Sequence, residues 1–277
     1  MAAVATVAPV HVSPASARSD RLRITFDTTP VGTVLGAGST VADMSGRGNH
    51  GAVVTAYGGS VVAVAGDPAA ADFPGKCAAD PCPNALVQIA DHASLDPRTA
   101  DFEWGARILL SPSETDDGEN IIQKGEWGEA GGQWKLQVDK AGGVPSCVVS
   151  GNVPGQSKAR RVVLQASIGV ADGMWQQVTC RRTTAGGIQV VIDGVLRGVA
   201  AMPAVDLSSA AAVTIGANRV VPSANDQFHG VLDDVFMTVL DESSSGSGEQ
   251  FPVETVAAVP VAASATATAV RLPVDQP

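Results

Sequence analysis

Aromatic and charged side chains are scarce in this sequence. Aromatic residues make up 4% of the 277 residues, with a single tyrosine, and charged residues make up 17%. The 28 acidic side chains outnumber the 18 basic ones and give a formal net charge of −10. An acidic chain without a basic stripe repels phosphate backbones, so we expect no nucleic-acid partner.

Long apolar runs are also missing. No stretch approaches the roughly 18 consecutive apolar residues that a membrane-spanning helix needs, so no membrane span is expected. Hydrophobic residues still make up 45% of the chain, which is enough to bury a substantial core. The length suits one large domain with tails.

Apolar and polar residues alternate with period two through the middle of the chain, whereas long helical periodicity is absent. This alternation is typical of half-buried strands. One predicted face contains Phe102, Trp104, Ala106, Ile108 and Leu110, and another contains Ile188, Val190 and Ile192. Glycine-rich turn signals recur at intervals of about 8–12 residues, which favours antiparallel strands stacked in a sandwich.

The four cysteines form two natural pairs. Cys77 and Cys82 flank a turn-rich segment, and Cys147 and Cys180 lie on two predicted strands. The alternative is a zinc site, but neither Cys147 nor Cys180 has a second ligand at zinc-site spacing. We therefore predict two disulfides, and with them an oxidising compartment.

Both ends of the chain differ in composition from the middle. Residues 1–20 contain an Ala- and Val-rich run that ends in Ala15-Ser-Ala17, the small-x-small pattern of an export signal, although a basic start is missing. The alternative is a disordered tail. Residues 241–277 contain a Ser/Gly-rich linker followed by an Ala/Val/Pro-rich tail. The predicted domain is residues 21–240, and the predicted location is secreted, extracellular.

Four stretches in fixed order resemble the concanavalin A-like, laminin-G-like jelly-roll family. They are residues 43–51 (DMSGRGNHG), 175–179 (WQQVT), 188–194 (IQVVIDG) and 228–235 (FHGVLDDV). The resemblance implies an all-β fold, a two-sheet antiparallel β-sandwich. Members of this family bind glycans or proteins, and some relatives on the same scaffold are glycosidases or lyases, so function has to be argued from the site.

The loop at residues 43–51 suggests a structural calcium site. Asp43 and Asn49 make it rich in oxygen, as a cation with six to eight oxygen ligands requires. The resemblance implies that Asp233 and Asp27 lie near this loop. The alternative is an Asx-type turn, in which Asp43 and Asn49 cap their own backbone. Asp233 and Asp234 are expected to point to opposite faces unless a bulge shifts the register.

The acidic segment Glu114-Thr-Asp116-Asp-Gly-Glu119 has the Glu-x-Asp-x-x-Glu spacing of retaining glucanases on this fold. A glucanase would use one carboxylate as nucleophile and one as general acid. The intervening residues are polar, so we expect a solvated loop in which burial raises no carboxyl pKa. No catalytic residue is predicted. The histidines His11, His50, His92 and His229 are expected to be surface or hydrogen-bonding residues.

Glycans stack on aromatic side chains, and few are available. Trp104, Trp134 and Trp175 fall within strand patterns and are expected in the core. Trp127 lies in a Gly-rich loop, so Trp127, together with Tyr57, is the predicted ligand-binding pair.

The sequence thus predicts a secreted, non-catalytic module that binds a polysaccharide, a cell-surface glycan or another surface. The alternatives are a glycoside hydrolase or polysaccharide lyase on the same fold, and an adhesion module that binds a protein partner.

Overall fold

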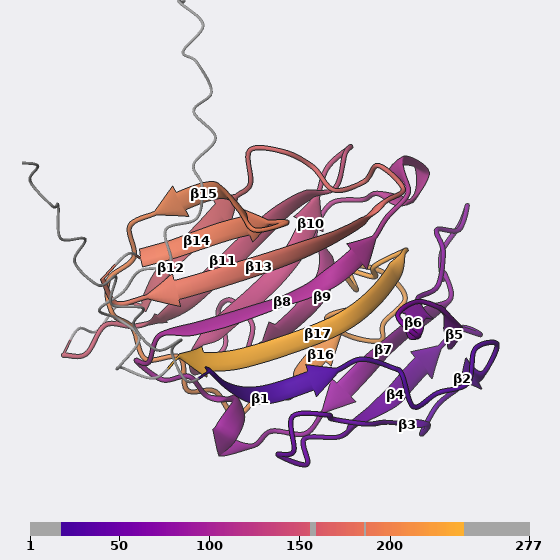
Figure 1. Cartoon of the computed structure of the whole chain (residues 1–277), viewed down its shortest axis with the longest axis horizontal. Helices are drawn as coiled ribbons and strands as arrows, with labels where there is room; N and C mark the ends of the chain where they lie inside the picture. Colours follow the sequence, from indigo (N-terminus) through magenta and orange to yellow (C-terminus); the bar gives the residue numbers. More distant parts are fainter. Residues whose placement is uncertain (1–17, 156–158, 186, 241–277) are drawn as a thin grey trace, which may run out of the picture.

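The computed structural model describes residues 18–155, 159–185 and 187–240. Two antiparallel sheets stack face to face in this part of the chain, with the nine-stranded sheet in front in Figure 1 and the eight-stranded sheet behind it. This confirms the predicted all-β sandwich. Residues 18–20, expected in the N-terminal tail, pair with the final strand. Residues 1–17 and the predicted tail 241–277 lie outside the described residues.

The nine-stranded sheet has the order β15-β14-β13-β8-β17-β6-β5-β2, with β1 beside β17. Its strands are β1 (Arg18–Ile24), β2 (Val34–Leu35), β5 (Val61–Ala65), β6 (Ala69–Asp72), β8 (Phe102–Leu109), β13 (Trp175–Thr183), β14 (Gly187–Ile192), β15 (Val195–Ala200) and β17 (Val231–Leu240).

The eight-stranded sheet has the order β12-β11-β10-β9-β16-β7-β4-β3. Its strands are β3 (Thr40–Val41), β4 (Gly51–Ala56), β7 (Asn84–Ile89), β9 (Glu119–Lys124), β10 (Gln133–Asp139), β11 (Val144–Asn152), β12 (Ala159–Gln165) and β16 (Val213–Ile215). Two short 3-10 helices, η1 (Ala93–Leu95) and η2 (Pro112–Glu114), lie in the connecting loops.

The period-two alternation determines which side chains fill the space between the sheets. On β8, the predicted inner residues Phe102, Trp104, Ala106 and Ile108 are all fully buried. Since successive strand residues point to opposite faces, Glu103, Gly105 and Arg107 lie on the outer face of the same strand. Each strand of this pattern therefore supplies one apolar row to the core and one polar row to the surface.

An aromatic cluster and a disulfide join the two sheets through the core. Trp104 of β8 and Trp134 of β10 have ring centroids 6.2 Å apart, and Phe102 stacks on Trp104 at 4.6 Å. Cys147 of β11 is bonded to Cys180 of β13, which pairs with Trp104 in the ladder. This bond and Cys77–Cys82 confirm both predicted disulfides.

A bulge interrupts the pairing of β17 with β8. Asp233 pairs with Arg107 and Phe236 with Gly105, so two residues of β17 lie opposite Ala106 alone. The extra residue is Asp234, which has a positive φ of 48°. Because of this insertion Leu232, Val235 and Met237 all reach the core, while Asp233, Phe236 and Thr238 lie on the outer face.

Removing the inter-sheet disulfide should destabilise the fold more than removing the short one. The Cys147–Cys180 bond closes a separation of 33 residues and Cys77–Cys82 a separation of 5. In the chain-entropy model, losing the long bond lowers the unfolding free energy by about 4 kcal/mol, and losing the short one lowers it by about 2 kcal/mol. We expect the double variant Cys147→Ala, Cys180→Ala to lose about twice the unfolding free energy lost by Cys77→Ala, Cys82→Ala in urea titrations. Equal losses would contradict the assignment of Cys147–Cys180 as the main cross-link.

Candidate functional site

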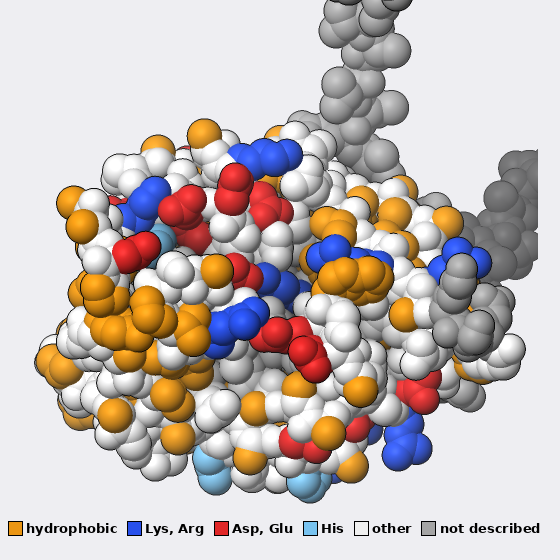
Figure 2. Space-filling view, turned by 180° about the vertical axis from the view of Figure 1, so that it is seen from behind, with side chains coloured by type: hydrophobic (Ala, Val, Ile, Leu, Met, Phe, Trp, Pro, Cys, Tyr) orange, Lys and Arg blue, Asp and Glu red, His pale blue; other side chains and the backbone are white. Residues whose placement is uncertain are grey.

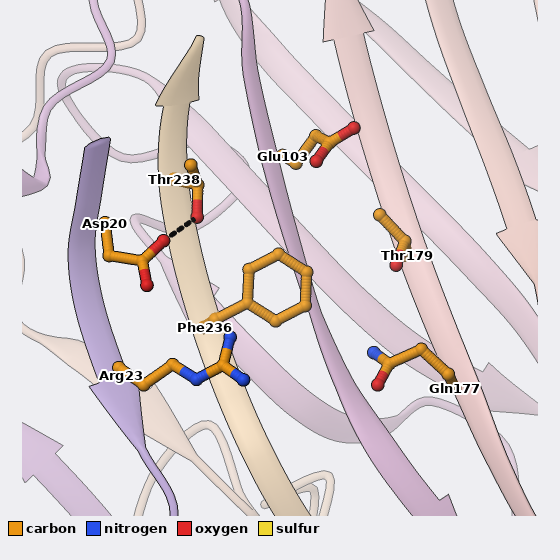
Figure 3. A pocket seen from close by; sticks show the side chains of 7 residues that line it. All are labelled: Asp20, Arg23, Glu103, Gln177, Thr179, Phe236 and Thr238. Atoms are coloured by element: carbon orange, nitrogen blue, oxygen red, sulfur yellow. Dashed lines mark hydrogen bonds between the residues drawn. The ribbon is translucent and has the colours of Figure 1, made fainter. Parts of the chain in front are cut away.

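A polar hollow lies on the outer face of the nine-stranded sheet. It has a volume of about 650 Å³ and crosses four neighbouring strands, β1, β17, β8 and β13 (Figure 3). It is lined by Asp20, Arg23, Glu103, Gln177, Thr179, Phe236 and Thr238. These residues come from the start, the middle and the end of the domain sequence, and the pairing of the strands brings them together.

The strand register arranges the outer side chains in three rows that run across the strands. The two flanking rows are rich in charge, whereas the middle row is uncharged from β17 to β13. The first row is Asp20, Thr238, Glu103 and Arg181; the middle row is Phe236, Gly105 and Thr179, with Arg23 at its β1 end; the third row is Asp233, Arg107 and Gln177. We call this arrangement the groove.

Gly105 forms the floor of the groove. A Cβ at this position would collide with the carbonyl oxygen of Val178 and lie 3.0 Å from Cε1 of Phe236. Glycine therefore allows the Phe236 ring to lie close over the sheet instead of standing away from it. Figure 3 shows the ring between Arg23 on one side and Thr179 and Gln177 on the other. The half-buried ring thus offers an apolar surface in the middle of a polar face.

The bulge places both Asp233 and Asp234 next to arginines of the outer face. Arg107 Nη1 donates to Asp233 Oδ2 at 3.4 Å, and Arg23 Nη2 donates to Asp234 Oδ1 at 3.0 Å. Burial raises the pKa of Asp233 to about 6, against the lowering effects of the Asp234 amide and Arg107. Arg107 also lies 5.1 Å from the centroid of the Trp175 ring. Trp175 is therefore half-buried on the outer face, and its predicted place in the core is wrong.

The first row is held by short polar contacts. Both Nε and Nη2 of Arg181 contact Oε1 of Glu103, and Glu103 is 3% exposed. The Thr238 hydroxyl donates to Asp20 Oδ1 at 2.6 Å, which Figure 3 marks with a dashed line. These contacts fix the side chains before any ligand arrives, so the groove has a defined shape.

The outer face of the eight-stranded sheet differs, because a loop covers part of it. Residues 217–227 cross this face, where Lys135 Nζ is 2.8 Å from Asp226 Oδ2 and the Asn120 amide donates to the Asp226 carbonyl at 2.8 Å. Figure 2 shows this side with acidic and basic side chains interspersed. Lys135 is buried as a result.

The predicted ligand-binding pair, Trp127 and Tyr57, is split between two ends of the eight-stranded sheet. Trp127 follows the end of β9, and the register aligns that end with Gly51 at the start of β4. Tyr57 follows the other end of β4. Both side chains are exposed, at 55% and 42%, and the Arg161 guanidinium lies 5.0 Å from the Trp127 ring centroid. They therefore cannot contact one small ligand together.

The loop at residues 43–51 is held by hydrogen bonds to the Asp43 carboxylate. Oδ1 accepts from the amides of Arg23 and Ser45, and Oδ2 accepts from the Ser45 hydroxyl and the Asn49 amide, at 2.8–3.0 Å. Burial alone would raise the pKa of Asp43, but these hydrogen bonds outweigh it and lower the pKa below its ordinary value. The Asn49 side chain donates to the Arg21 carbonyl at 2.7 Å. This geometry is that of the Asx-type turn.

The other predicted calcium ligands do not join this loop. Asp27 accepts a hydrogen bond from the Ala69 amide at 3.4 Å, and its negative charge helps to raise the pKa of Asp233. Nowhere in the described residues do three His, Cys, Asp or Glu side chains come close enough to hold a metal ion. Calcium binding stays a prediction, and the four predicted ligands do not fit a single site in this geometry.

Three histidines make hydrogen bonds in the loops. His50 Nδ1 accepts from the Asp43 amide, and His92 Nδ1 accepts from the Ser94 amide at the start of η1. His229 Nδ1 is 2.7 Å from the Pro74 carbonyl. The expectation for these three is confirmed, and His11 lies outside the described residues.

Replacing Asp43 should destabilise the protein whether or not calcium is present. Asp43→Ala leaves three backbone amides without their acceptor, and we expect a loss of about 3 kcal/mol. Asp27→Ala, which removes one long hydrogen bond, is the control and should cost far less. The measurement is thermal unfolding in millimolar calcium and in chelator. A calcium-dependent rise in the midpoint that both Asp43→Ala and Asp233→Ala abolish would instead establish the metal site.

The acidic segment is a loop up to Gly118, but Glu119 begins β9 and is 1% exposed. Glu114 accepts a hydrogen bond from the Lys76 amide, and Lys76 Nζ lies 3.6 Å from Asp116. Burial raises the pKa of Glu119 to about 8 and outweighs the nearby amides of Asp116 and His229, which lie outside normal hydrogen-bond geometry. The expectation that burial raises no carboxyl pKa here is therefore wrong for Glu119.

Glu119 should make stability fall as the pH rises. Its pKa is about 8 in the folded state and 4.5 unfolded, so the folded protein binds more protons between these values. The unfolding free energy therefore decreases across this window, by several kcal/mol in total. We expect Glu119→Gln to match the parent near pH 5 and to be more stable near pH 8, with Glu114→Gln as the control. If the unfolding free energies of the parent and Glu119→Gln changed in parallel with pH, this role of Glu119 would be contradicted.

Solved structures of other proteins share the β-sandwich fold of this chain. No family model matches the chain, and no curated protein matches it. Domain 4 of AbnA, a GH43 extracellular arabinanase from Geobacillus stearothermophilus solved with arabinotriose, is 15% identical, with a TM-score of 0.54 over 82% of this chain and 96% of that one.

Toxin binding domains are similar over part of their length. The binding domain of Paraclostridial Mosquitocidal Protein 1 is 12% identical, with a TM-score of 0.53 over 81% of this chain and 50% of that one. The binding domain of botulinum neurotoxin DC, in complex with SialylT, is 13% identical, with a TM-score of 0.53 over 82% and 50%. This chain thus spans about half of each toxin domain, and these likenesses establish a β-sandwich.

No helix in the described residues is both long enough and apolar enough to cross a membrane.

Proposed function

We propose that this chain is a secreted, non-catalytic carbohydrate-binding module of the laminin-G-like, concanavalin A-like class, and that the groove binds a polysaccharide or cell-surface glycan. The observation that carries this proposal is the Phe236 ring lying over Gly105 between two polar rows. An aromatic face packs against the C–H face of a sugar ring, and polar side chains beside it can bind the sugar hydroxyls.

The groove residues match the hydrogen-bonding needs of a sugar. Gln177 and Thr179 each have a donor and an acceptor, and Asp20 has acceptor oxygens. A hydroxyl group both donates and accepts, so such a mixture suits it. Four strands about 4.8 Å apart span about 14 Å, which is long enough for an oligosaccharide.

Similar sandwiches support a glycan ligand in general terms. The AbnA domain was solved with arabinotriose, and it matches this chain over nearly all of its own length. Secretion is supported by the two disulfides, which form and persist in oxidising compartments. The predicted export signal lies in the part of the chain outside the described residues.

The charged residues of the groove favour binding over catalysis. A glycosidase requires one carboxyl as acid and a second as base or nucleophile, both facing the glycosidic bond. In the groove, Glu103 is buried against Arg181, and Asp20 accepts a hydrogen bond from Thr238. Those contacts hold both groups in structural roles, which supports a non-catalytic module over the hydrolase or lyase alternative.

Removing the Phe236 ring should weaken glycan binding. Aromatic contacts contribute about 0.5–1.5 kcal/mol beyond area burial, and the apolar area covered by the ring is lost as well, so we expect Phe236→Ala to weaken binding of the best-bound glycan by about tenfold or more. The measurement is a glycan array with and without calcium, followed by titration calorimetry of the strongest glycan. Trp127→Ala is the control, because Trp127 lies in the β9–β10 loop of the other sheet.

The opposite result for these two variants would place the binding site elsewhere. If Trp127→Ala abolished binding while Phe236→Ala kept it, with both variants folded by circular dichroism, the β9–β10 loop would be the binding site and the groove would not.

A further inference from the structure

Each of the three arginines around the groove already faces a carboxylate of the protein. Arg23 pairs with Asp234 at 3.0 Å and Arg107 with Asp233 at 3.4 Å, and Arg181 contacts Glu103. Glycan carboxylates and sulfates are usually held by arginine, whose fork of donors matches their oxygens. Here that charge is already balanced within the protein.

Two of these pairs are difficult to open. The side chains of Glu103 and Asp233 are 3% and 2% exposed, so a ligand anion that took their arginine would leave a buried carboxylate without its partner. The Trp175 ring lies against the Arg107 guanidinium and restricts a second approach to it. The pairs thus act as fixed walls of the groove.

The remaining charge around the groove is negative. Asp20 adds a carboxylate to the first row, next to the paired Glu103. The whole chain carries a formal net charge of −10, which also repels anions. The middle row, where a sugar would lie on Phe236, contributes no charge between β17 and β13.

We propose that the groove selects neutral oligosaccharides and rejects glycans that carry carboxylate or sulfate groups. This inference rests on the proposed function and adds the ligand class. The residues that set the selectivity are Asp233, Asp234 and Glu103, because each occupies an arginine that an acidic sugar would need.

The test compares sugars that differ only at C6, which carries a hydroxymethyl group in the neutral sugar and a carboxylate in its acidic partner. The probes are cellotetraose and β-1,4-linked tetraglucuronate, and β-1,4-mannotetraose and its tetramannuronate counterpart, with the best neutral array glycan and its C6-oxidised form as a third pair. By calorimetry at low salt, we expect each bound neutral probe to bind at least tenfold more tightly than its acidic partner. Equal or tighter binding of the acidic partners would overturn the inference and leave the proposed function in place. Absence of binding by every glycan, neutral or acidic, would overturn both.

Two variants test the cause of the selectivity. Asp234→Asn removes the carboxylate that balances Arg23 in the most exposed pair, so it should narrow the preference for neutral over acidic glycans by about tenfold. Asp116→Asn removes one negative charge away from the groove and should leave the preference unchanged. If Asp116→Asn narrowed the preference as much as Asp234→Asn, net charge rather than arginine pairing would set it, and the role given to these carboxylates would be wrong.

Discussion

The pairing of β17 with β8 is the constraint on which both the core and the groove depend. These strands lie at the centre of the nine-stranded sheet, and the bulge at Asp234 sets their register. If the strand kept Asp234 but alternated regularly, without the bulge, the side chains after Asp233 would exchange faces. Phe236 would then enter the core, and Val235 would lie on the surface. One inserted residue therefore decides which side chains the protein buries and which it presents.

The groove combines a rigid charged frame with an uncharged middle. Ion pairs hold Glu103 and Asp233, and Thr238 holds Asp20, so these side chains lose little freedom when a ligand binds. Gly105 removes bulk where the Phe236 ring needs to lie. The same three rows of side chains thus give the groove its shape, its apolar surface and its hydrogen-bonding groups. Such preorganisation favours recognition of a fixed ligand shape over adjustable contact with many partners.

The sequence was a good guide to features that depend on neighbouring residues. The alternation from Phe102 to Leu110 predicted the inner face of β8, and the spacing of the cysteines predicted both bonds. It was a poor guide to the groove, because Phe236 meets Gly105 across more than a hundred residues of sequence. The available signal was the Glu103-x-Gly105-x-Arg107 pattern on the outer face of β8, which places a glycine between two charged residues.

Burial at the first residue of a strand was hardest to predict. Glu119 lies in an acidic segment that reads as solvated, yet it is enclosed at the start of β9 near Lys76 and His229, which come from distant parts of the chain. Trp175 is the opposite case, since its apolar character suggested the core and an outer-face arginine holds it at the surface.

The central claim is that the groove binds glycan, and NMR amide-shift mapping with a bound neutral oligosaccharide tests it most directly. The account predicts that the largest shifts cluster at Gly105, Gln177, Thr179 and Phe236, and shifts confined to the β9–β10 loop around Trp127 would contradict it.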